Sequence, residues 1–264
     1  MKFTRTLALA SAALGMALVT GAASAGVAFQ LNSGGTNSGG SWGNDRTFIG
    51  NDGVNGVNVS ADAWSNTGGS SGNIETAYLG QYGGGLGVCN QDESKKATSC
   101  SNPSHTVDNG SARIDSVLFS FNGDVNLASL TTGYIANSSG GSYHADGDFS
   151  VLYYKGAGTI ASLANLTYAN MVSSGDWGVF GNYNAALGTT TFSDVQTFSS
   201  YWLVSAFNPT FGSATGADKG DDYFKIESFI VNVPTPGTHV PEPATLTLLG
   251  LGLAGIGFSR RRRK

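Results

Sequence analysis

The sequence predicts an all-β protein: a single antiparallel β-sandwich of jelly-roll type, flanked by an N-terminal signal helix and a short C-terminal membrane helix. Aromatic residues make up 11% of the 264 residues, unlike the composition of a disordered chain. Short alternating runs recur about every 8–12 residues and are separated by turns rich in glycine, which is typical of sandwiches. The body shows no sustained helical period.

The N-terminus has the parts of a secretory signal: a positively charged start, an apolar stretch over residues 7–19 and an A-x-A cleavage site. The cleavage residues are Ala23 and Ala25, and Gly26 becomes the first residue of the mature protein. We therefore expect residues 1–25 to be a signal peptide that directs export through the Sec machinery.

The extracellular sandwich is expected to span residues 26–233. Its expected strands cover residues 47–49, 54–64, 74–79, 113–121, 125–135, 148–154, 177–183, 189–192, 201–207 and 223–233. The clearest is 113–121, in which Val117, Phe119 and Phe121 face one way and the intervening residues face the other. Residues 159–171 are expected to hold one or two helical turns.

Four tryptophans divide into two kinds. Trp64 and Trp202 lie within apolar strands and are expected in the core. Trp42 and Trp177 adjoin loops, where a flat apolar ring can stack on a sugar, so they are carbohydrate-binding candidates. For Trp177 a place in the core is the competing interpretation.

The net charge excludes one class of partner. When the two ends expected to be removed by processing are left out, the body has seven basic and 17 acidic residues, a net charge of about −10. Such a surface repels nucleic acid and attracts divalent counterions.

Cys89 and Cys100 are the two cysteines of the chain. In an oxidising compartment we expect them to form a disulfide that closes a polar loop. A metal or redox pair is the alternative, but no histidine lies near enough in sequence to support it.

Two acidic groups are candidates for a calcium site, because calcium prefers several oxygen ligands. The candidate ligands are Asp146, Asp148, Asp221 and Asp222, with His144 and Asp218 beside them. Ordinary acidic turns are the alternative, since no complete calcium-loop signature occurs. The groups form one site only if the fold brings them together. Calcium is the one cofactor that the sequence suggests. Asp108, followed by Asn109 and Gly110, favours an Asx turn over a ligand role.

No enzyme signature is present. The sequence lacks a nucleophile elbow, a zinc motif, a P-loop and a dinucleotide fingerprint. The body contains three glutamates, a thin supply for the acid and base of a glycosidase. We expect no catalytic residue and no enzymatic activity.

The C-terminus has three parts in order: Val-Pro-Glu-Pro, a Leu- and Gly-rich span over residues 244–258, and a basic cluster at the end. The span is 15 residues long, shorter than the about 20 needed to cross a bilayer. Residues 234–240 are expected to be a linker. The motif residues are Pro241, Glu242 and Pro243, and the cluster is Arg260, Arg261, Arg262 and Arg263.

Residues 241–264 resemble the PEP-CTERM sorting signal. The resemblance implies an exported protein of a Gram-negative bacterium. It is transiently anchored in the inner membrane by the C-terminal helix, processed by an exosortase, and passed to the cell surface or extracellular matrix. Scattered body segments, including residues 105–109 and 222–225, resemble exosortase-dependent surface proteins.

We therefore expect a structural or adhesive role linked to exopolysaccharide or biofilm, with exosortase and exopolysaccharide as partners. The alternatives are a lectin-like, calcium-dependent carbohydrate-binding module and, third, a polysaccharide-modifying enzyme.

Overall fold

The computed structural model describes residues 26–37, 45–49, 56–68, 72–93, 100, 105–136, 146–160, 162–218 and 220–234. The two expected terminal helices, the linker beyond residue 234, the sorting motif, Trp42 and His144 lie outside these residues.

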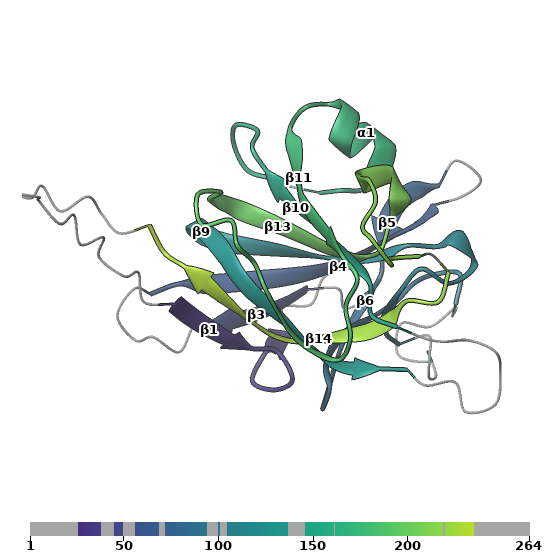
Figure 1. Cartoon of the computed structure of the whole chain (residues 1–264), viewed down its shortest axis with the longest axis horizontal. Helices are drawn as coiled ribbons and strands as arrows, with labels where there is room; N and C mark the ends of the chain where they lie inside the picture. Colours follow the sequence, from purple (N-terminus) through teal and green to yellow (C-terminus); the bar gives the residue numbers. More distant parts are fainter. Residues whose placement is uncertain are drawn as a thin grey trace, which may run out of the picture.

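The described residues form a 14-stranded sheet with one short α-helix (Figure 1). The strands up to the cysteine loop are β1 (Gly26–Gln30), β2 (Thr36–Asn37), β3 (Asp45–Ile49), β4 (Asn58–Gly68), β5 (Asn73–Thr76), β6 (Tyr78–Tyr82) and β7 (Gly85–Cys89). The remaining strands are β8 (Val107–Asp108), β9 (Asp115–Ile135), β10 (Phe149–Tyr154), β11 (Trp177–Tyr183), β12 (Gly188–Thr191), β13 (Ser199–Ala206) and β14 (Tyr223–Asn232). The helical pieces are α1 (Tyr168–Ser173), η2 (Gly110–Ala112) and η3 (Pro209–Phe211).

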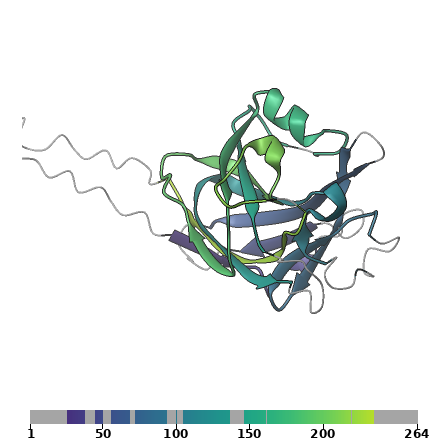
Figure 2. The ribbon, with the colours of Figure 1, turned by 45° about the vertical axis from the view of Figure 1, so that its right-hand side comes forward.

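The long strand β9 belongs to both layers of the folded sheet, because its two halves pair with different strands. Its first half lies between β4 and β13, where Phe119 is opposite both Ala61 and Trp202. Its second half pairs with β14, where Leu130 is opposite Phe229, and with β12. The prediction of two separate strands at 113–121 and 125–135 was wrong, because β9 continues through residues 122–124 with a register shift against β13. The sheet therefore curls on itself (Figure 2), which confirms the predicted all-β antiparallel sandwich.

The main core lies between the two layers. Phe229 of β14 packs against Phe29 and Phe119, with ring centroids 5.0 Å apart in both pairs. Trp202 is fully buried, and its indole N–H donates to the carbonyl oxygens of Val125 at 3.2 Å and Ser199 at 3.0 Å. The apolar faces of β1, β9, β13 and β14 thus close on one another, and the core positions expected for Trp64 and Trp202 are confirmed.

A second, smaller core covers the outer face of the β10–β13–β9 layer. Leu118 and Leu203, which point away from the main core, pack there with Met171 of α1 and Phe211 of η3. Both faces of these strands are therefore buried, although simple alternation predicts only one. α1 begins at Tyr168, near the end of the segment expected to be helical, after a Thr167 side chain that accepts a hydrogen bond from the Asn170 N–H.

Candidate cation site

The fold brings the two acidic groups into one place. Asp146 and Asp148 precede β10, and Asp222 directly precedes β14. Asp146 and Asp222 form a parallel bridge, in which the Tyr223 N–H donates to the Asp146 carbonyl at 3.0 Å. The condition that sequence reasoning left open is thereby met, because the two groups share one end of the sandwich.

Asp148 is fully buried and is held by backbone donors. Its Oδ1 accepts from the Ala185 N–H at 2.8 Å, and its Oδ2 accepts from the Asp218 N–H at 3.1 Å. Burial still raises the pKa of Asp148 to about 6, above its ordinary value, with a smaller contribution from the charge of Asp146. The side chain therefore ties two loops to the start of β10.

Asp222 is fully buried and, like Asp146, has a side-chain oxygen without a hydrogen-bond partner among the described residues. Its side chain is 0% exposed, and its Oδ1 has no hydrogen-bond partner among the described residues, while its Oδ2 accepts from the amide of Asn109. Burial, followed by the neighbouring Asp146 and Asp148, raises the pKa of Asp222 to about 10. Keeping such a carboxylate ionised requires a compensating cation; without one, the group takes up a proton and becomes neutral.

Asn109 holds this arrangement together, and sequence reasoning assigned it only to a turn. Its amide also donates to the Phe207 carbonyl at 3.0 Å, and its Oδ1 accepts from the N–H groups of Gly220 at 2.9 Å and Asp222 at 3.2 Å. The expected Asx turn at Asp108 is also present, with the Gly110 N–H donating to Asp108 Oδ1 at 3.0 Å. No local sequence signal distinguishes a turn residue from one that holds the acidic group together, because Asn109 contacts its distant partners only after the strands pair.

The size of the group matches one ion. Ligand oxygens of Asp146, Asp148 and Asp222 lie within 4.8 Å of one another, and so do those of Asp146, Asp218 and Asp221. Oxygens on opposite sides of a calcium ion are about 5 Å apart, since each Ca–O distance is about 2.4 Å. Asp146 belongs to both sets, and the second set is partly exposed, so it forms the outer rim.

Among the residues that the structure describes, no lysine or arginine forms a salt bridge with these carboxylates. Within the described part of the chain, the one salt bridge joins Arg113 and Asp92, 2.7 Å apart. Burial and the nearby Asp218 raise the pKa of Asp221 to about 6, as expected where negative charges accumulate. The arrangement can therefore hold a hard, oxygen-preferring divalent cation.

The carbohydrate candidate Trp177 belongs to the second core. It is 5% exposed, and its ring packs edge-on against Tyr154 with centroids 5.4 Å apart. Trp177 therefore has the core position of the competing interpretation and not that of an exposed sugar-stacking residue, because it packs in the second core with Met171 of α1.

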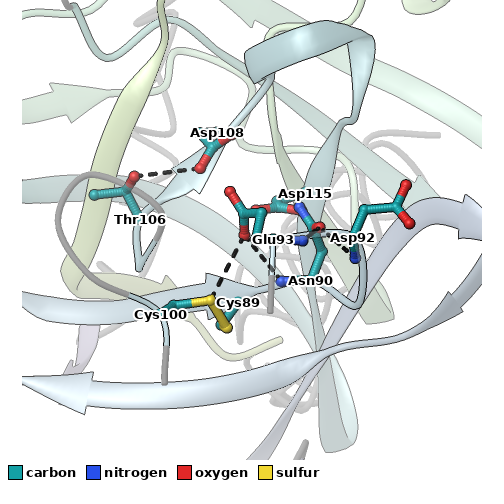
Figure 3. Close-up of a disulfide and its surroundings, with 8 residues drawn as sticks. All are labelled: Cys89, Asn90, Asp92, Glu93, Cys100, Thr106, Asp108 and Asp115. Carbon is teal, nitrogen blue, oxygen red and sulfur yellow. Dashed lines mark hydrogen bonds between the residues drawn. A yellow bond between two sulfur atoms is a disulfide. The ribbon is translucent and has the colours of Figure 1, made fainter. Parts of the chain in front are cut away.

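The two cysteines do form the expected disulfide, Cys89–Cys100 (Figure 3). Cys89 ends β7, and the bond closes the loop that follows it. The disulfide is therefore compatible with an extracellular location of the body, since such bonds persist in oxidising compartments.

Residues 239–263 match the family model of the PEP-CTERM protein-sorting motif. The chain carries a PEP-CTERM sorting signal at its C-terminus. The matched segment contains Pro241, Glu242 and Pro243, and it also includes the basic cluster at residues 260–263, as the resemblance predicts. The motif marks this PEP-CTERM protein for export, exosortase-dependent processing and surface display, with transient membrane anchoring on the way.

No curated protein matches this chain. Among the described residues, no helix is long and apolar enough to span a membrane.

Proposed function

We propose that this PEP-CTERM protein is a calcium-stabilised, non-catalytic surface or matrix protein with a structural or adhesive role linked to exopolysaccharide. One observation supports this most strongly: the fully buried Asp222 directs an unpartnered carboxylate oxygen into a group of acidic side chains. A bound cation supplies the missing partner and cancels the accumulated negative charge.

Calcium at this position joins three segments of the chain. Asp146 and Asp148 come from the approach to β10, Asp222 from the approach to β14, and Asn109 fixes the Asp222 side chain from the end of β8. Extracellular calcium modules bind with dissociation constants of about 0.1–1 mM, so the site is suited to calcium levels outside the cell. The ion then stabilises a body that has to persist without intracellular repair.

The burial of the acids favours this role over catalysis. The acid and base of a glycosidase flank the sugar in an open cleft. Asp148 and Asp222 are both 0% exposed, so a sugar ring does not reach them.

The direct test is thermal unfolding of the full chain, purified in mild detergent, in calcium and in EGTA. The proposal expects the melting temperature to rise with calcium and to return to its starting value after chelation. Equal melting temperatures in both conditions, together with no calcium uptake by calorimetry, would refute it.

Calcium-dependent carbohydrate binding is the second candidate, and a cavity next to the site favours it. The cavity is lined by Asn109 and Gly220 together with Ile114, Phe207, Asn208 and Pro209. The Asn208 amide nitrogen is buried and has no partner among the described residues, so a polar ligand group can satisfy it. A polysaccharide pull-down with and without calcium tests this function, and no retention in either condition excludes it.

A further inference from the structure

A second group of acidic side chains lies beside the disulfide (Figure 3) and includes Asp108, the chain neighbour of Asn109. Glu93 follows β7, Asp108 ends β8, and Asp115 begins β9. One ligand oxygen from each of the three lies within 4.8 Å of the others, close to Cys89–Cys100 (Figure 3). Asp115 is 0% exposed and Asp108 is 1% exposed, so this group is more deeply buried than the rim of the first site.

Asp115 shows that the group is incomplete. Its Oδ1 accepts from the Asn90 amide at 3.1 Å, whereas its Oδ2 is buried and has no hydrogen-bond partner among the described residues. Burial raises the pKa of Asp115 well above its ordinary range, and the charges of Asp108 and Glu93 add to the effect. An unpaired carboxylate oxygen at this depth is costly unless a cation or proton meets it.

The loop closed by the disulfide positions Glu93. The Glu93 N–H donates to Asn90 Oδ1 at 3.1 Å, and the Asn90 N–H donates back to Glu93 Oε2 at 3.1 Å. The Sγ atom of Cys100 lies 3.9 Å from the same carboxylate oxygen. The disulfide thus anchors both ends of the segment that carries this acid.

We propose that Glu93, Asp108 and Asp115 form a second calcium site, distinct from the site at Asp146, Asp148 and Asp222. Three carboxylates offer up to six oxygens, and their spacing fits a single calcium coordination sphere of about 5 Å. The nearby sulfur atoms are joined in a disulfide and supply no thiolate, so the ligand set is all oxygen and suits a hard cation. Magnesium is less suited, because it keeps several waters and rarely takes an all-carboxylate site.

This site extends the proposed function without depending on it. Asp108 belongs to the second site and its neighbour Asn109 donates a hydrogen bond to Asp222 of the first, so the end of β8 connects the two sites. Calcium ions in both sites would then stabilise the same end of the sandwich.

Calorimetric titration of the full chain in detergent with calcium chloride separates the two sites by stoichiometry. Asp115→Asn is expected to bind one calcium ion fewer than wild type, and Asp222→Asn is expected to lose the other ion. The matched control is Asp124→Asn, at an exposed position of β9, which should keep wild-type stoichiometry. Glu93→Gln provides a second test at a less buried position, in case Asp115→Asn fails to fold.

The outcomes are distinct. Wild-type stoichiometry in both Asp115→Asn and Glu93→Gln overturns the second site, and the acids then share protons instead. Loss of an ion in these variants but not in Asp222→Asn supports the second site and refutes the first. Reduction of Cys89–Cys100 should weaken the Glu93 site by about tenfold or more, since it releases a group that orients a ligand.

Discussion

Replacing Asp222 with asparagine removes the carboxylate that the proposed first site uses when calcium is bound, and it leaves the shape of the side chain nearly unchanged. The amide keeps a carbonyl oxygen for the hydrogen bond from Asn109. Because the pKa of Asp222 is about 10, the carboxyl is protonated near neutral pH when no cation is bound. We therefore expect the variant to melt close to wild type in EGTA.

The size of the calcium effect follows from mass action. With a dissociation constant of about 0.1–1 mM, calcium at about 10 mM stabilises the folded protein by about 1.4–2.7 kcal/mol. For a body of this size, each kcal/mol shifts the melting temperature by about 2–4 °C. The calcium-induced rise in Asp222→Asn should therefore be smaller than that of wild type by about 3–11 °C.

Differential scanning calorimetry with Asp124→Asn as the control measures this difference. Asp124 is exposed, so its variant should respond to calcium as wild type does. The reasoning is refuted if Asp222→Asn retains the full calcium-induced rise, or if the control loses it to the same extent.

Four further predictions concern the core, the charge of β4, the disulfide and the sorting motif. Trp202→Ala should cost about 3–5 kcal/mol, seen as a lower urea midpoint, because Trp202 is fully buried; an unchanged midpoint contradicts this packing. Burial, followed by the charge of Asp45, raises the pKa of Asp62 from 3.8 to about 7, so the folded state binds this proton more tightly than the unfolded state does. The stability that this proton gives the folded state is therefore complete below about pH 4 and is lost as pH rises through 7. Asp62→Asn should accordingly have a higher melting temperature than wild type at about pH 8 but not at about pH 4. Equal differences in melting temperature at both pH values would rule this out. Removing the disulfide with paired Cys→Ser changes should cost about 3 kcal/mol for a separation of 11 residues, and a free energy of unfolding equal to that of wild type would argue against the bond. Glu242→Ala should hold the protein in the inner-membrane fraction of an exosortase-containing host, whereas normal surface delivery would show that Glu242 is dispensable for sorting.

Alternation along single strands was a dependable guide to the core. Val117, Phe119 and Phe121 all face the main core, as their period of two predicts. The same pattern did not reveal that Leu118 and Leu203 are buried under α1, because a second covering layer depends on where a distant segment packs.

The sorting route, the all-β class and the disulfide could be recognised from residue order, since each depends on a short segment or on the spacing of a few residues. The candidate cation site could not be assembled that way. The acidic residues stand in two separate turns of the sequence, and Asn109 is 113 residues from its partner Asp222. Strand order decides whether such turns meet, and strand order results from the packing of the whole sheet. The tertiary structure alone therefore turned ordinary acidic turns into one buried, charge-rich site.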